Sequence, residues 1–343
     1  MNNTLNSQQK TIFLTGGSGV FGQALLTNLN PDSFICLSHR KSIPYPGVNV
    51  IQGDLLLPQL GLSNVQLEEL AQKIDGIVHA AAITDFGKPD ELIHNTNVRG
   101  LENIIEFAKL AQVPLYYIST AFVRPNSQKR GNTEHAYIFS KREAEKLLRE
   151  SEVPHIIIRP SIIIGDSMSG CISRFQGFYN VAGTVIKNFL PILPALSSEA
   201  YTDLIPQDVV ANAVFSLINA RCTSREYWIC SGEKAPSISE VIELVMEFAI
   251  KLGYPIKPPK LVSFDSFERL LQPTFMSALP TTVQKGFKLI AQVSPYMSIE
   301  EPFSTSLPEI EKRFGLSPSA NIKTAINRSL EYWGNKTRLR NGC

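Results

Sequence analysis

Short apolar segments recur through the first 165 residues, and stretches with amphipathic, helix-like spacing lie between several of them. The segments read TIFLTG, SFICLS, VNVIQGD, GIVHAAA, VPLYYIST and PHIIIRPSIII, at residues 11–16, 33–38, 48–54, 76–82, 113–120 and 154–164. Helices are expected at about 20–29, 93–112 and 137–151. Strands that are apolar on both faces and alternate with helices indicate a parallel sheet covered on both sides. The pattern predicts an α/β, Rossmann-type doubly wound fold, whose ligands bind at the carboxyl ends of the strands.

The pattern changes after about residue 165. One more strand-like segment, EYWIC at 226–230, precedes an amphipathic helix at 237–253, for which Ser237 or Ser239 is available as the N-cap. The region from 255 to 320 is rich in Pro, Phe and Ser and is expected to form short helices and loops. A closing helix is expected at 321–333.

We expect two parts from this change of pattern. A Rossmann domain over 10–250 takes strands from the chain up to about 165 and again near 226–230, and a smaller, mainly helical substrate-binding lobe takes 166–206 and 251–343. The aromatic side chains of the lobe either line an apolar acyl pocket or form its core, and burial is the more general fate of such residues. They are Phe264, Phe267, Phe275, Phe287, Tyr296 and Phe303.

Composition narrows the classes of partner. The net charge of +2 and the absence of a basic stripe give no case for nucleic acid. No apolar run approaches the ~20 residues of a membrane span, and the polar N-terminus MNNTLNSQQK does not read as a signal peptide, so we expect a cytoplasmic protein. Neither the cysteines nor the histidines show metal-ligand spacing, so no metal site is expected. The cysteines, which are expected to be reduced thiols, are Cys36, Cys171, Cys222, Cys230 and Cys343. The histidines are His39, His79, His94, His135 and His155.

A glycine-rich stretch, FLTGGSGVFG, follows the first predicted strand and opens the first predicted helix. Glycines spaced three apart permit a tight turn, close approach of backbone N–H groups to a pyrophosphate, and close packing of helix on strand. The alternative is a simple strand-to-helix turn. The candidate cofactor contacts are Gly16, Ser18, Gly19, Val20, Phe21 and Gly22.

The ends of the second and third strands carry candidate contacts to the rest of a dinucleotide. His39, Arg40 and Lys41 stand where an NAD-binding chain carries an acid for the ribose, and two fixed cations suit the 2′-phosphate of NADPH. A solvated basic turn is the alternative. Asp54, followed by Leu55, is placed to accept from the adenine amino group or, alternatively, to cap a turn.

The segment AYIFSKREAEK places Tyr137 and Lys141 four residues apart, on one face of a predicted helix. Alone, the pair is equally an ordinary surface feature or a proton-transfer pair. The remainder of the helix, from Arg142 to Arg149, reads as a solvated face.

The motifs TGGSGVFG, GD, HAAA, NVRG, YISTAFV, Tyr137-x-x-x-Lys141 and RPSIIIGD occur in one order that resembles the extended short-chain dehydrogenase/reductase superfamily. More narrowly, HAAAITDFG, STAFV and RPSIIIGDSMSG resemble its male sterility-type branch of thioester reductase domains, carboxylic acid reductase termini and fatty acyl-CoA reductases. The wider resemblance covers about residues 10–250, and the narrower one rests on three short stretches.

The resemblance implies roles for individual residues. Tyr137 is the general acid/base, Lys141 lowers the pKa of its phenol and holds the nicotinamide ribose, and Thr120 binds the substrate oxygen, with Ser119 as its alternate. Asn97 helps to hold the lysine through a water or, alternatively, is a polar residue of the helix interior. Further cofactor contacts are expected from Ala80, Ala81, Ala82, Pro160, Ser161 and Ile163, and Asp203, Pro206 and Asp208 are expected to be structural.

The expected reaction is reduction of a carbonyl by NADPH, most simply of an acyl thioester to an aldehyde. The 343 residues include no adenylation or carrier segment, so the acyl group is expected on coenzyme A or on a separate carrier protein. Without the large extra C-terminal domain of the longer fatty acyl-CoA reductases, a long-chain acyl group is less expected. The same motifs also fit a hydroxysteroid-type alcohol dehydrogenase or ketoreductase, a sugar-nucleotide epimerase or dehydratase, or a non-enzymatic NADP(H) sensor. A homodimer is compatible with the superfamily.

Overall fold

The computed structural model describes residues 10–27, 31–43, 45–125, 135–187, 191–254 and 256–337. Met1 to Gln9, Cys343 and the end of the first predicted helix lie outside the described residues. The chain divides into two compact units, the first from Met1–Ser119, His135–Ile158 and Val214–Tyr227, the second from Thr120–Glu134, Arg159–Ala213 and Trp228–Cys343. The division expected from the sequence, 10–250 against 166–206 and 251–343, stays a prediction.

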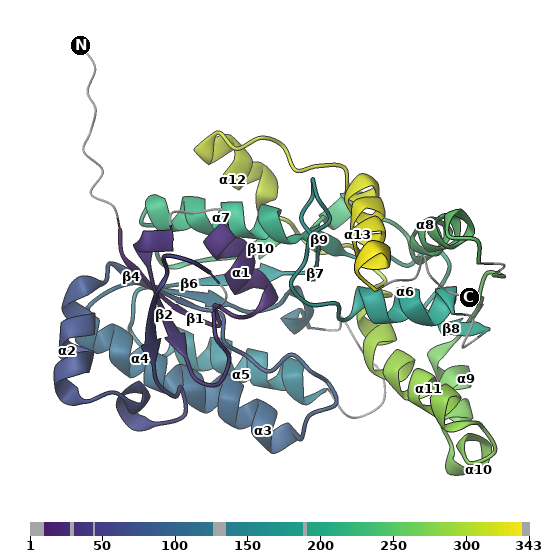
Figure 1. Cartoon of the computed structure of the whole chain (residues 1–343), viewed down its shortest axis with the longest axis horizontal. Coiled ribbons are helices and arrows are strands. Elements are labelled where there is room, and N and C mark those ends of the chain that lie inside the picture. The colour runs from purple at the N-terminus through teal and green to yellow at the C-terminus, as the bar shows by residue number, and fades with distance from the viewer. Residues whose placement is uncertain are drawn as a thin grey trace. The chain divides into compact units, whose positions relative to one another are not determined.

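A seven-stranded sheet in the order β10-β6-β5-β4-β1-β2-β3 is the centre of the fold (Figure 1). All of the strand pairs with a described register in this sheet, from β1 to β6, are parallel. The predicted doubly wound α/β class is therefore confirmed. The strands are β1 (Ile12–Thr15), β2 (Phe34–Ser38), β3 (Asn49–Gln52), β4 (Gly76–His79), β5 (Leu115–Ile118), β6 (His155–Pro160) and β10 (Arg225–Ile229).

Helices cover both faces of the first unit's sheet. Figure 1 shows α2, α4 and α5 against one face and α1 against the other. On the α2/α4/α5 side, alternate strand residues such as Phe13, Ile77 and Tyr117 join helix residues in one buried core. The helices are α1 (Val20–Thr27), α2 (Asn64–Lys73), α3 (Asp90–His94), the π-helical segment Asn95–Arg99, α4 (Gly100–Ala111), α5 (Ala136–Arg149) and α7 (Gln207–Asn219).

The apolar run 154–164, predicted as one strand, forms two. β6 ends at Pro160, whose nitrogen has no hydrogen to donate to a ladder. The chain then changes partner: Ser161 N donates to Ile229 O and Ile162 N donates to Asp203 O. From there β7 (Ile162–Ile164) pairs in parallel with β9 (Leu204–Pro206) in a separate sheet.

The second unit is mainly helical. Its helices are α6 (Phe178–Ile186), α8 (Ile238–Lys251), α9 (Phe264–Leu270), α10 (Pro273–Met276), α11 (Thr281–Val293), α12 (Leu307–Phe314) and α13 (Ile322–Lys336). Of the two predicted caps for α8, Ser237 is the one used, in a capping box with Glu240. A small parallel pair, β8 (Ile192–Pro194) and β11 (Lys260–Val262), was not predicted.

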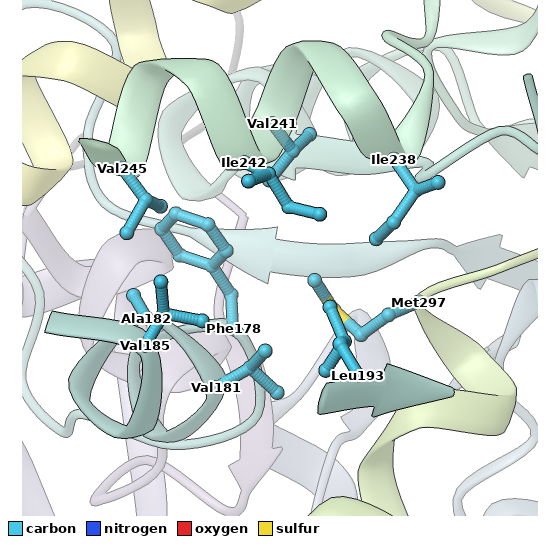
Figure 2. Close-up of a pocket in the computed structure, with 10 residues that line it drawn as sticks. All are labelled: Phe178, Val181, Ala182, Val185, Leu193, Ile238, Val241, Ile242, Val245 and Met297. Atoms are coloured by element: carbon cyan, nitrogen blue, oxygen red, sulfur yellow. The ribbon is translucent and has the colours of Figure 1, made fainter. Parts of the chain in front are cut away.

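An apolar interior joins α6, α8 and β8 in the second unit. Figure 2 shows Phe178 of α6 pointing toward Val245 and Ile242 of α8, with Leu193 and Met297 at the other end. The void between these side chains is about 10 Å³, the space of roughly one water molecule, and its lining is almost wholly apolar. It is packed core and too small for an acyl group.

The aromatic residues singled out from the sequence are mostly buried. Phe267, Phe287, Tyr296 and Phe303 are buried, whereas Phe275 is 39% exposed. Phe267 stacks on Phe287 with ring centroids 5.4 Å apart. These contacts favour the core role over the acyl pocket for the four buried rings.

Candidate active site

The glycine-rich turn joins β1 to α1 and presses closely on its surroundings. Gly16 has a φ of +79°, and a Cβ added there would stand 2.6 Å from the backbone of Ala80 and Ala81. A Cβ on Gly22 would stand 2.3 Å from the Gly16 oxygen, and Gly19 N donates to that same oxygen at 2.9 Å. Only glycine fits these positions, so the chain offers the open backbone turn that a pyrophosphate requires.

The loop after β2, which carries the predicted basic residues, approaches this turn through Ile43. A Cβ on Gly17 would be 3.1 Å from Ile43 Cδ1, which places the 39–43 loop against the glycine-rich segment. Arg40 and Lys41 are exposed, and neither has a side-chain partner among the residues that the structure describes. Two exposed cations therefore belong to the loop that contacts the glycine-rich turn through Ile43.

Asp54 and Leu55 serve the turn after β3. Asp54 Oδ1 accepts from Leu56 N at 2.9 Å, and Oδ2 lies 3.4 Å from His39 Nε2. Leu55 is buried, and a Cβ on Gly100 would be 2.7 Å from its Cδ2. One carboxylate oxygen of Asp54 therefore caps the turn, as in the alternative interpretation. A contact between Asp54 and adenine stays a prediction.

Asn97 links three elements of the first unit. It is buried within the π-helical segment, and its Oδ1 accepts from Ile83 N at 2.8 Å. Its Nδ2 donates to Ile83 O at 3.2 Å and to Ser140 Oγ at 3.0 Å. The side chain therefore ties the loop after β4, which carries Ala80 to Ala82, to α5. A π-turn re-aims the residue that it contains, and such turns are frequent at functional sites.

Tyr137 stands in the first turn of α5 and is partly exposed. His135 caps the helix, since its Nδ1 accepts from Tyr137 N at 3.1 Å. Its Nε2 lies 3.1 Å from Phe86 O, and a carbonyl can only accept, so this nitrogen carries the proton. Phe86 meets the rings of His135 and Tyr137 edge-on, with centroids 4.5 Å and 5.6 Å away. His135 and Phe86 were not predicted as site residues, because one reaches Tyr137 through a helix cap and the other through a loop contact.

Lys141 lies one turn further along α5 and is only 3% exposed. Its Nζ donates to Ile118 O at 2.7 Å and sits 4.6 Å from the centre of the Tyr117 ring. Burial lowers the pKa of Lys141 to about 7, while the charge of Glu145 acts in the opposite direction. The predicted pair is thus on one helix, with Tyr137 partly exposed and Lys141 buried.

His79 and Thr15 occupy neighbouring strand ends beside this lysine. They are paired in the register of β1 and β4, and Thr15 Oγ1 is hydrogen-bonded to His79 Nδ1 at 2.7 Å. Burial, together with the charge of Lys141, lowers the pKa of His79 to about 3. The imidazole is therefore neutral near pH 7 and adds no second positive charge beside Lys141.

Ser119 and Thr120 follow β5 and are both buried. Ser119 Oγ donates to Glu145 Oε1 at 2.6 Å, which commits that hydroxyl. Thr120 belongs to the second unit, where it caps the 3₁₀ turn Ala121–Val123 and accepts weakly from Phe122 N at 3.4 Å. Glu145 also corrects the sequence analysis: it lies in the stretch of α5 read as a solvated face, yet it is 3% exposed.

The remaining predicted contacts belong to the second unit. Pro160 and Ser161 are buried and Ile163 is partly buried, at the β6–β7 junction. Asp203, expected to be structural, accepts from Ser231 N at 2.9 Å and Gly232 N at 3.0 Å, as predicted. Burial raises the pKa of Asp203 to about 6, and the nearby Ser161 hydroxyl lowers it without meeting hydrogen-bond geometry.

The described residues were also compared with the requirements of a metal site, a disulfide and a membrane span. Within the described ranges, no group of three or more His, Cys, Asp and Glu side chains is arranged to hold a metal ion. Cys36, Cys171, Cys222 and Cys230 are free thiols, and Cys171 is the exposed one among them. None of the described helices combines the length and the apolar character needed to cross a bilayer.

The fold and the glycine-rich turn define the class of this protein, an NAD(P)-dependent oxidoreductase of the extended short-chain dehydrogenase/reductase type. The chain belongs to the male sterility protein family, whose NAD-binding profile matches residues 41–214. The family resemblance predicted from the motifs is therefore confirmed, and a nicotinamide dinucleotide is the class of cofactor.

Relatives in this family are far larger proteins. Fusarin C synthetase of Gibberella moniliformis is 28% identical over 236 residues, which cover 60% of this chain and 6% of that protein. The hybrid PKS-NRPS synthetase gkaA of Penicillium citrinum is 26% identical over 269 residues, which cover 69% of this chain and 7% of that protein. The chain thus spans less than a tenth of the length of these relatives.

Solved structures share the fold. The terminal R domain from the myxalamid PKS-NRPS biosynthetic pathway superposes with a TM-score of 0.75 at 22% identity, covering 97% of this chain and 92% of that one. The Bordetella bronchiseptica enzyme WbmG, in complex with NAD and UDP, gives a TM-score of 0.64 at 18% identity, covering 96% of each chain. At these identities the likeness concerns the fold.

Proposed function

We propose that this protein is an NADPH-dependent reductase that converts an acyl thioester to an aldehyde. The observation that carries the proposal is the Tyr137/Lys141 arrangement: a buried ammonium 2.7 Å from the Ile118 oxygen, and a partly exposed phenol one turn away on the same helix. A lysine held on a backbone carbonyl has a fixed position, from which its charge favours the phenolate form of a neighbouring tyrosine. Membership of an NAD-binding family supports reading this pair as reductase machinery.

The residues of the first unit fit a dinucleotide. The turn at Gly16, Gly19 and Gly22 leaves no room for a Cβ at two of its positions, and its N–H groups are suited to the pyrophosphate. Arg40 and Lys41, exposed in the loop that contacts the turn through Ile43, are assigned to the 2′-phosphate, which selects NADPH over NADH. When bound, the nicotinamide supplies a hydride.

The chain's own groups manage the substrate oxygen and its proton. Thr120 is assigned to polarise the carbonyl, because the Ser119 hydroxyl is already donated to Glu145. Tyr137 gives its proton to the oxygen as the carbonyl carbon takes the hydride, and Lys141 stabilises the phenolate that remains. The tetrahedral hemithioacetal then loses the thiol: its hydroxyl proton passes to the departing sulfur, the C=O bond re-forms and the C–S bond breaks. The products are an aldehyde and a free thiol, so one two-electron reduction is balanced.

Carrier-bound thioesters are the proposed substrate class. The relatives include PKS-NRPS synthetases, and the structural neighbours include R domains of such systems. We assign the acyl group to a phosphopantetheine thiol, on a carrier protein or on coenzyme A. The expected homodimer is a separate proposal, which sedimentation of the purified chain would test.

Oxidation of NADPH, followed by absorbance against a panel of substrates, tests the function. The panel holds carrier-bound acyl groups, acyl-CoAs, aldehydes, ketosteroids and nucleotide sugars, and NADH is run in parallel. We expect turnover with thioesters, aldehyde as product, and loss of more than about 100-fold of kcat in Tyr137→Phe. Tyr332→Phe, a tyrosine of α13, is the matched control and should retain wild-type turnover. Turnover with nucleotide sugars or ketosteroids alone would replace the thioester assignment, and NADPH binding without any turnover would favour a sensor.

A further inference from the structure

A buried carboxylate lies one helical turn beyond Lys141. Glu145 is 3% exposed, and both of its oxygens are used within the first unit. Oε1 accepts from Ser119 Oγ at 2.6 Å, and Oε2 accepts from Arg149 Nη2 at 2.8 Å. Arg149 in turn donates from Nε and Nη2 to Glu226 Oε1 on β10, at 2.8 Å and 2.6 Å. A carboxylate buried with this many partners is a built feature, since isolated buried charges are strongly disfavoured.

The network reaches the residue that follows the one holding Lys141. Ile118 O accepts from Lys141 Nζ, and the next residue, Ser119, is held by Glu145. Ser119 N also donates to Ile158 O at 2.7 Å, which fixes the residue in the sheet. The end of β5 is therefore attached to α5 at two points four residues apart on the helix, one through the ammonium and one through the carboxylate.

Glu145 is the charged group that acts on the pKa of Lys141. The groups recorded around the ammonium are His79 on β4, Tyr117 on β5 and Glu145 on α5, and Tyr137 acts electrostatically on Tyr117. Burial keeps His79 neutral and raises the pKa of Tyr117 well above its ordinary value. The charge of Glu145 raises the pKa of Lys141 and so opposes the effect of burial. Glu145 is itself paired with Arg149, which is also paired with Glu226.

We propose that Glu145 is a positioning residue for Lys141, which holds the end of β5 on α5 through Ser119 and places a fixed negative charge one turn from the ammonium. Glu145 contacts neither substrate nor cofactor in this assignment, and acts through Lys141. The inference rests on the proposed function only where turnover is measured. Its geometric and electrostatic part is a property of the protein without substrate.

Glu145→Gln is the decisive variant, because it keeps the shape and an acceptor for Ser119 but removes the charge. Loss of the negative charge should lower the pKa of Lys141, since the ammonium loses its stabilising neighbour. The limb of the kcat/KM profile that falls with rising pH should then move to lower pH by about one unit, while kcat on the acid side stays within about three-fold of wild type. Glu150→Gln is the matched control: the same charge change at the C-cap of the same helix, at an exposed carboxylate 3.9 Å from Lys146, should leave the limb in place.

A measurement without substrate separates this inference from the proposed function. Titration of the Lys141 side chain by NMR, assigned with Lys141→Arg, should show the lower pKa in Glu145→Gln and no change in Glu150→Gln. An unmoved Lys141 titration overturns the inference whatever the substrate is. Failure of the whole substrate panel with a moved titration overturns only the thioester assignment.

The second contact is tested by Ser119→Ala, which also serves if Glu145→Gln does not fold. This variant keeps the charge, so the pH limb should stay in place, while kcat falls several-fold because the end of β5 is less firmly held. Wild-type turnover in Ser119→Ala would refute the role given to the Ser119–Glu145 hydrogen bond, which is to hold Ile118 in place for Lys141.

Discussion

Replacing Lys141 by Met is expected to stabilise the fold at acid pH while abolishing reduction. The ammonium is only 3% exposed, and burial brings its pKa down to about 7 from 10.5, with Glu145 acting against that shift. Methionine has a similar length and no charge to desolvate, so it suits the same site. Burial of the charged Lys141, which is assigned to catalysis, is therefore expected to lower the free energy of unfolding.

The sign and size follow from linkage. The folded pKa lies below the unfolded value, so the unfolded chain binds more protons between pH 7 and pH 10.5, and the wild-type free energy of unfolding rises with pH in that window. With these two pKa values the rise from about pH 6 to about pH 8.5 is about 2 kcal/mol. Methionine does not titrate, so the advantage of Lys141→Met should be greatest at about pH 6 and shrink by about 2 kcal/mol by about pH 8.5.

Urea unfolding followed by circular dichroism at both pH values gives the free energy of unfolding of each protein. The quantity to compare is the difference between Lys141→Met and wild type at the two pH values. Lys146→Met, at an exposed lysine of the same helix, is the control and should follow wild type at both pH values. Any change in packing caused by methionine is the same at each pH and cancels. A stability difference between wild type and Lys141→Met that does not vary with pH would refute the argument that Lys141 is a desolvated, titrating group.

Three further predictions concern single features of the chain. Arg40→Ala should raise the Kd for NADPH about ten-fold in a fluorescence titration and leave NADH binding unchanged; an equal effect on both would remove Arg40 from the 2′-phosphate. Gly22→Ala should weaken NADPH binding more than about 100-fold, because its Cβ would stand 2.3 Å from a carbonyl oxygen of the same turn, whereas Gly87→Ala in an exposed loop should bind normally. Ser237→Ala should lower the free energy of unfolding by about 1 kcal/mol through loss of the cap, and an equal loss in Ser239→Ala would contradict the assignment of the cap.

The strands of the main sheet were predictable because parallel strands buried on both faces are nearly continuous apolar runs between polar breaks. The error at 154–164 has a definite cause. Sequence periodicity records how apolar a run is, but the change of partner at Pro160 and Ser161 depends on Ile229 and Asp203, which are distant in the chain. No local pattern carries that information.

Helices and strands with few buried residues were missed for a related reason. In α2 only Leu67 and Leu70 are buried, so the apolar stripe is too short to stand out, and the helix start depends on the capping box of Ser63 and Gln66. β8 and β11 have three residues each, below the length at which alternation is visible.

In the candidate site, too, local features were predictable from the sequence and contacts between distant residues were not. Spacing alone placed Tyr137 and Lys141 on one helix face, and the helix is present over both residues. What the spacing does not contain is the burial of the lysine, its bond to Ile118 and the bond of Glu145 to Ser119, because Ile118 and Ser119 meet α5 only in the folded chain. Glu145 looked solvated because charged residues surround it in the sequence.

The π-helical segment has a consequence for how this protein tolerates change. A π-turn carries one more residue than an α-helical turn needs, so deleting one residue between α3 and Asn97 would give a more regular helix. Each residue in an α-helix turns by about 100°, so the same deletion would swing the Asn97 amide away from Ile83 and Ser140. The molecule would then gain helical regularity and lose the tie between the loop after β4 and α5. Length variation in this helix is therefore a sensitive reporter of whether that tie matters, even where every side chain is retained.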